Sequence, residues 1–129
     1  MRIAVLKERR AHEYRVAGSP ETVGKFIELG AEVVVEAGAG AASGTPDSAF
    51  EGAGATVAND ADSALSGADL ILKVQRPIIA SEGEDELARF TRGQMLVCQM
   101  GALTEPDFVN ALAEAGLTGF ALELVPRIS

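Results

Sequence analysis

Residues 3–16 read IAVLKERRAHEYRV, a short apolar run followed at once by a strongly charged stretch. The apolar run at 3–6 is typical of a buried strand in a parallel sheet. Ser19-Pro20-Glu21 follows and predicts the start of a helix, with Ser19 as its N-cap and Pro20 in its first turn. Strand, charged loop and helix in this order place the loop at the carboxyl edge of a parallel sheet, where α/β proteins bind ligands.

The same alternation continues along the chain. Apolar and β-branched runs predict strands at 3–6, 31–36, 55–58, 69–74, 94–100 and 118–124. Capping residues and helical spacing predict helices at 20–29, 46–52, 60–65, 82–90 and 105–115, the one at 82–90 being acidic and exposed. The pattern therefore predicts an α/β fold, a three-layer Rossmann-like or flavodoxin-like parallel sheet of about six strands with helices on both faces.

Composition excludes several classes of protein. The 129 residues fit one domain, and the net charge of −8 argues against binding to nucleic acid or to an anionic membrane surface. No apolar run reaches the roughly 18 residues of a membrane-spanning helix, and we expect no direct membrane insertion and a cytoplasmic protein. A single cysteine, Cys98, excludes a disulfide framework and is predicted to be a small buried hydrophobe. His12 is the one histidine, so we expect no metal site.

The cations gather where the predicted strands end. Seven of the eleven Lys and Arg residues lie there, namely Lys7, Arg9, Arg10, Arg15, Lys73, Arg76 and Arg127. As a group they predict a basic rim that holds a carboxylate or a phosphate. The alternative is that the cations pair with neighbouring acidic residues and only fix loops, the candidates being Glu8, Glu13, Glu36 and Glu123.

The glycine-rich loop at 37–44 resembles part of a dinucleotide fingerprint. Gly38 and Gly40 follow a predicted strand, and acidic residues stand about 20 positions further on. However, Ser43 takes the place of the third glycine, and the next helix begins only after 45–46. We therefore expect a close-packed turn here instead of a phosphate site.

Several stretches, taken in order, resemble one superfamily. They are KERR at 7–10, EYRVA at 13–17, EAGAG at 36–40, KVQRP at 73–77, GALT at 101–104 and ELVPRIS at 123–129. Together they cover the chain and resemble the alanine dehydrogenase and proton-translocating transhydrogenase superfamily. VQRP at 74–77 and PRIS at 126–129 are closer to its transhydrogenase branch, the alpha subunits of NAD(P) transhydrogenase.

This resemblance implies an NAD(H)-binding component built from two Rossmann-like domains. Residues 1–129 correspond to the N-terminal domain, and the domain with the NAD fingerprint is absent from the sequence. The implied reaction is hydride transfer between NAD(H) and NADP(H), coupled to proton movement across the membrane, with the fragment alone inactive. The implied partners are the rest of the alpha subunit, an NADP(H)-binding component, a membrane component and a second copy in a homodimer. Such a chain would lie in the cytoplasm, on the inner face of the cell membrane.

The resemblance also assigns site residues, though no certain catalytic one. Arg127 matches an arginine whose loop contacts the nicotinamide, and is the predicted cofactor-binding residue. Arg15 and Lys73 match residues that hold the carboxylate of pyruvate in alanine dehydrogenases. Gln99 stands where those enzymes carry a substrate-binding histidine, so an alanine dehydrogenase is disfavoured. Arg15, Lys73 and Gln99 are thus cleft-lining candidates, and the alternative function is an alanine dehydrogenase-like or stand-alone carboxylate-binding domain that uses Arg15 and Lys73.

Overall fold

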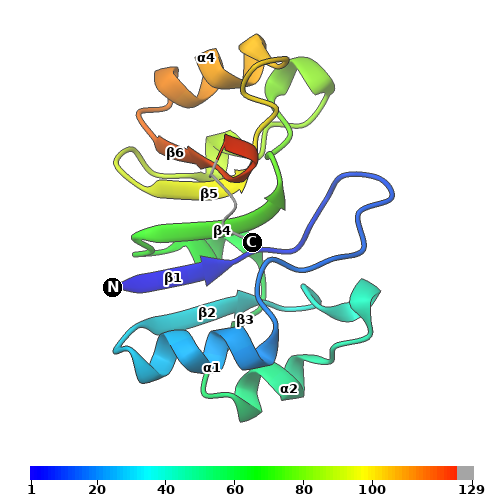
Figure 1. The fold of residues 1–129 in the computed structure, drawn as a ribbon, viewed down its shortest axis with the longest axis vertical. Helices are drawn as coiled ribbons and strands as arrows, with labels where there is room; N and C mark the ends of the chain where they lie inside the picture. The colour runs from blue at the N-terminus through cyan, green and yellow to red at the C-terminus, as the bar shows by residue number, and fades with distance from the viewer. Residues whose placement is uncertain (125–129) are drawn as a thin grey trace.

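The computed structural model describes residues 1–124, in which six strands form one parallel sheet (Figure 1). The strands are β1 (Arg2–Val5), β2 (Glu32–Glu36), β3 (Thr56–Ala58), β4 (Leu70–Gln75), β5 (Met95–Gln99) and β6 (Thr118–Ala121). Their order in the sheet is β3-β2-β1-β4-β5-β6, and every neighbouring pair is parallel. This is the doubly wound order in which the chain returns to the middle of the sheet after β3. The predicted fold class is confirmed.

The helices begin at the predicted caps. They are α1 (Pro20–Glu28), α2 (Asp47–Gly52), α3 (Ala61–Leu65) and α4 (Pro106–Glu114). The Ser19 hydroxyl accepts the N–H of Thr22 at 3.2 Å, and the Asp60 carboxylate accepts the N–H of Ser63 at 2.7 Å. These contacts satisfy N–H groups that a helix leaves unpaired in its first turn. None of the described helices is long and apolar enough to cross a bilayer.

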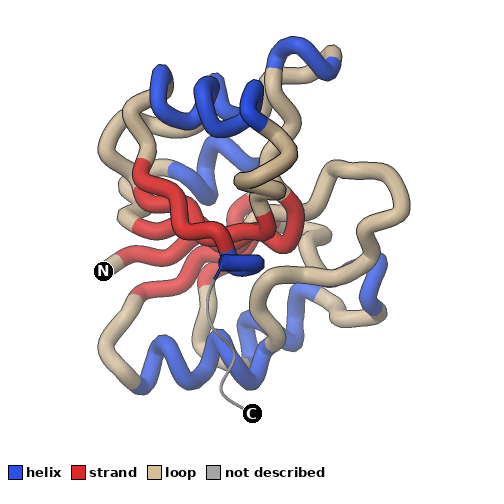
Figure 2. Tube along the Cα trace, turned by 45° about the horizontal axis from the view of Figure 1, so that its top comes forward, coloured by secondary structure: helices blue, strands red, loops and turns tan. Residues whose placement is uncertain are grey.

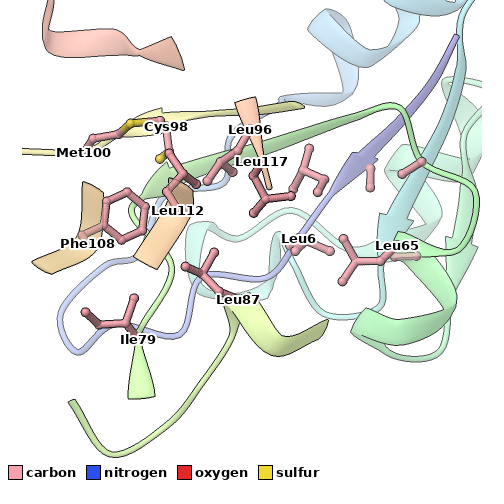
Figure 3. Close-up of a cluster of buried hydrophobic side chains, with 14 of the residues drawn as sticks. Leu6, Leu65, Ile79, Leu87, Leu96, Cys98, Met100, Phe108, Leu112 and Leu117 are labelled. Carbon is pink, nitrogen blue, oxygen red and sulfur yellow. The ribbon is translucent and has the colours of Figure 1, made fainter. Parts of the chain in front are cut away.

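Helices cover both faces of the sheet (Figure 2). On one face, α1 and α2 bury Val23 and Phe50 against alternate residues of β1 and β2. On the other face, α3, α4 and the short turn η3 (Leu87–Arg89) pack on the remaining residues of the strands. Figure 3 shows this second cluster, in which Phe108 and Leu112 of α4 lie close to Cys98 and Met100.

The face that carries α1 and α2 is covered unevenly. Leu72, Val97 and Phe120 occupy one row across β4, β5 and β6, because they are partners in the strand register. Leu72 packs against the cluster under α1, whereas the Phe120 side of the row is open and Phe120 is 50% exposed. The cavity described below opens on this side of the sheet.

Two predicted segments differ from the structure. The segment 82–90 is no helix, because Gly83 takes a left-handed backbone (φ 106°) and separates the turns η2 (Ala80–Glu82) and η3. Glu86 and Leu87 there are buried, not exposed. The predicted strand 118–124 ends at Ala121 and continues as the turn η4 (Leu122–Leu124), which lets the Glu123 carboxylate bond back to the end of β5.

The glycine loop is the close-packed turn that its sequence predicts. A Cβ on Gly40 would lie 2.6 Å from the Thr45 carbonyl oxygen and 2.9 Å from the Phe50 ring. The N–H of Gly38 is bonded to the Asp47 carboxylate at 2.9 Å, so it is not directed at a phosphate. The loop thus seals the end of the core under α2.

Candidate functional site

A cavity of about 460 Å³ lies between α1 and the carboxyl-terminal parts of β4 and β5. Its polar lining is Arg15, Lys73 and Gln99, and its apolar lining includes Phe26, Leu72, Val97 and Leu122. The structure thus brings the three cleft-lining candidates together, although they are up to 84 positions apart in the sequence (99 − 15). Arg127, the predicted cofactor contact, lies outside the described residues.

The ammonium of Lys73 is enclosed by protein. Its Nζ lies 3.3 Å from Glu8 Oε1 and 3.6 Å from Glu86 Oε2, and the side chain is 0% exposed. Nζ also donates to the carbonyl of Lys7 at 3.5 Å. A buried charge requires such partners, because leaving water without them costs several kcal/mol. Lys73 therefore borders the cavity while its charge is matched by two carboxylates.

Glu8 joins the loop after β1 to the end of β4. Its carboxylate accepts the N–H groups of Val74 and Gln75 at 3.0 and 2.9 Å, in addition to the contact with Lys73. The boundary between β1 and β4 is where strand order reverses and where sheets of this type usually bind ligands. Here that boundary is bridged by Glu8, and the cavity lies beside it, over β4 and β5.

Arg15 is exposed, yet its charge is also matched. Its guanidinium donates to both oxygens of Glu13, at 2.9 and 2.8 Å. Glu13 in turn accepts the side-chain amide of Gln75 at 2.9 Å. The bond from Arg15 lowers the pKa of the Glu13 carboxyl to about 2. Arg15 is therefore held in a defined orientation at the mouth of the cavity.

The remaining rim cations are tied to loops in the same way. Arg9 donates to Glu36, and Arg10 donates to Glu82 and to two backbone carbonyls. In the described part of the chain, five of the seven rim cations have a carboxylate partner, namely Arg9, Arg10, Arg15, Lys73 and Arg76. The structure thus favours loop fixing over a free basic rim. Glu123 differs from the expectation, since it accepts the backbone N–H groups of Met100 and Ala102.

Two further residues complete the picture of the site. Cys98 is buried, as predicted, and burial raises the pKa of its thiol to about 12, so it is no nucleophile. Glu86 was missed by the sequence reasoning, which placed it on an exposed helix. Its signal is weak: a glutamate directly before an apolar residue, Leu87, in an otherwise acidic segment.

Comparison with known proteins gives a consistent result. Residues 4–129 match the family model described as alanine dehydrogenase/PNT, N-terminal domain. All 129 residues are 52% identical to an NAD(P) transhydrogenase alpha subunit of Rhodospirillum rubrum, the first of the chains that make up that subunit, and cover 34% of it. Over 125 residues the chain is 37% identical to the alanine dehydrogenase of Mycolicibacterium smegmatis, covering 97% of the chain and 32% of that enzyme.

Among solved structures, a transhydrogenase from Sinorhizobium meliloti superposes over the whole chain with a TM-score of 0.89 and 43% sequence identity. The matched region is 37% of that protein. The chain therefore spans about a third of the length of the relatives that it matches.

Proposed function

The chain belongs to the alanine dehydrogenase/PNT N-terminal domain family, and on this basis we propose that it is the N-terminal domain of the NAD(H)-binding component of a proton-translocating NAD(P) transhydrogenase. The observation that carries the proposal is the 52% identity to a transhydrogenase alpha subunit along all 129 residues. In this proposal the complete subunit also contains a second Rossmann-like domain with the NAD fingerprint.

The proposed reaction is hydride transfer between NAD(H) and NADP(H). When bound, the two nicotinamide rings supply the hydride donor and acceptor, and the protein needs to hold them close and to exclude water. The described residues fit the ring better than the phosphates of a dinucleotide. Phe26, Leu72 and Val97 give an apolar wall beside the Gln99 amide, whereas the Gly38 N–H is already bonded to Asp47. Arg127 would orient the nicotinamide from the other side of the site.

The proposed partners follow from the function. They are the rest of the alpha subunit, an NADP(H)-binding component, a membrane component that couples hydride transfer to proton movement, and a second copy in a homodimer. The chain would then lie on the inner face of the cell membrane, held there by its partners.

A carboxylate-binding function resembling that of an alanine dehydrogenase is less well supported. Arg15 and Lys73 do border the same cavity. However, the Lys73 ammonium contacts Glu8 and Glu86 and is fully enclosed, so a keto acid would have to displace a buried carboxylate to reach it.

The test uses the complete protein with its partner components in membrane vesicles. We expect hydride transfer from NADH to NADP⁺ and no oxidation of NADH by pyruvate and ammonium. Arg127→Ala should lower the hydride-transfer rate by about tenfold or more, because misplacement of the ring raises the barrier. Lys25→Ala, an exposed change on α1, is the control and should keep the rate. Pyruvate-dependent oxidation without transfer to NADP⁺ would contradict the proposal.

A further inference from the structure

The geometry of the cavity points to a specific class of ligand. We propose that it receives a neutral ring carboxamide of the nicotinamide type in preference to a carboxylate. This inference rests on the proposed function, because it names the chemical group that the cavity takes in that function.

The charge balance around the cavity disfavours a carboxylate. Lys73 contacts two carboxylates, Glu8 and Glu86, and none of its side chain is exposed. Arg15 is bonded through two nitrogens to the single carboxylate of Glu13. An entering carboxylate would therefore find both cations already matched. Capturing Lys73 would leave a buried glutamate without its counter-ion, which is strongly unfavourable.

The hydrogen-bonding capacity of Gln99 favours a carboxamide. Gln99 ends β5 next to Gln75 of β4, and it is exposed to the cavity. The Gln75 amide is already bonded to Glu13, whereas within residues 1–124 the Gln99 side chain makes no hydrogen bond. A primary amide offers both an N–H donor and a carbonyl acceptor, so it matches another carboxamide in both directions. A carboxylate only accepts, and it would leave the Gln99 oxygen opposed to a negative oxygen.

The shape and polarity of the wall suit a flat ring. Phe26 of α1 lines the cavity together with Leu72 of β4 and Val97 of β5. The volume of about 460 Å³ accommodates a single heteroaromatic ring with its amide. An apolar wall with one convergent amide is the pattern expected for a flat, uncharged ring.

Nicotinamide and nicotinate provide a matched pair of probes, because they have the same shape and differ in charge. Each is titrated into the chain while backbone amide signals are followed by NMR. We expect nicotinamide to shift signals at Leu72, Val97 and Gln99 with a dissociation constant of order 1 mM. Nicotinate should bind at least about tenfold more weakly, a difference of one missing hydrogen bond plus repulsion. Equal or tighter binding of nicotinate, or no shift with nicotinamide, would overturn the inference.

Variants separate the two polar contributions. Gln99→Ala should weaken nicotinamide about fivefold or more, since one hydrogen bond is lost. Asn110→Ala, on the exposed side of α4 and away from the cavity, should leave it unchanged. Glu13→Gln removes the charge that matches Arg15, and it should strengthen nicotinate about threefold or more with little effect on nicotinamide. Nicotinate binding that does not change in Glu13→Gln contradicts the charge balance described above.

The ring can come from either of two cofactors, and Gln99→Ala in the complete protein distinguishes them. Weaker binding of NADH assigns the ring to NAD(H), and weaker binding of NADPH assigns it to NADP(H). Unchanged binding of both overturns the inference. Normal hydride transfer together with a preference for nicotinate would refute this inference alone, whereas absent hydride transfer with a preference for nicotinamide would refute the proposed function alone.

Discussion

At the scale of single residues, the group formed by Glu8, Lys73 and Glu86 dominates the site. All three side chains are at most 5% exposed, and the glutamates also accept backbone N–H groups of Val74, Gln75 and Ile78. Removing the one cation from such a group leaves two buried carboxylates without a counter-ion. That loss is much larger than the loss of an exposed ion pair.

Lys73→Met should therefore lower the free energy of unfolding by about 3–5 kcal/mol, measured by urea denaturation at neutral pH. Lys25→Met is the matched control, because Lys25 pairs with Glu21 on the exposed side of α1 at 3.5 Å. That substitution should cost less than about 0.5 kcal/mol. If the two variants are equally stable, the buried ion pairs do not exist as described.

At the scale of elements, the turn between β2 and α2 depends on Gly40. Gly40→Ala should destabilise the chain by about 1–3 kcal/mol, because the new methyl group meets the Thr45 carbonyl and the Phe50 ring. Gly52→Ala in α2 is the control, since nothing lies within 4 Å of its added Cβ. It should stabilise by about 0.5–1 kcal/mol through helix propensity. Thermal unfolding of both variants, followed by circular dichroism, gives the comparison, and equal shifts would contradict the packing of this turn.

Most elements could be predicted from the sequence because their signals are local. Ser19 and Asp60 mark helix starts by capping chemistry, and β-branched runs mark the strands. The segment 82–90 could not, because its conformation is decided by a distant partner: Glu86 turns inward toward Lys73. Likewise, topology and family resemblance placed Arg15, Lys73 and Gln99 at one cavity, but ion pairing leaves no pattern in the sequence, and their charge balance came only from the structure.

At the scale of the whole molecule, glutamates bridge the loops along the carboxyl edge. Arg15 holds the pKa of Glu13 at about 2, and Arg10 holds that of Glu82 at about 2, against 4.5 for a free glutamate. These pKa values are lower in the folded chain, so the unfolded chain takes up protons first as the pH falls. The stabilisation is complete above about pH 4.5 and is lost progressively as the pH falls toward about 2.

We therefore expect the free energy of unfolding to fall between pH 5 and pH 3, measured by urea denaturation at about four pH values in that range. The double change Glu13→Gln and Glu82→Gln should flatten this dependence, because it removes two of the groups that bind protons on unfolding. Glu51→Gln, at an exposed position of α2, is the control and should keep the original slope. An unaltered slope in the double variant would refute the assignment.

The bridges along this edge are not all of one kind. Glu36, Glu8 and Glu123 each accept backbone N–H groups from the neighbouring strand end, whereas the loops after β4 and β5 are joined by Arg76 and Glu105, two partly exposed side chains 3.2 Å apart. Dissolved salt screens an exposed pair of this type far more than a carboxylate that is bonded to backbone N–H groups. Ionic strength therefore acts selectively: it loosens the boundary beside the cavity and leaves the other loops in place, so buffer composition becomes a means of opening the site without changing a residue.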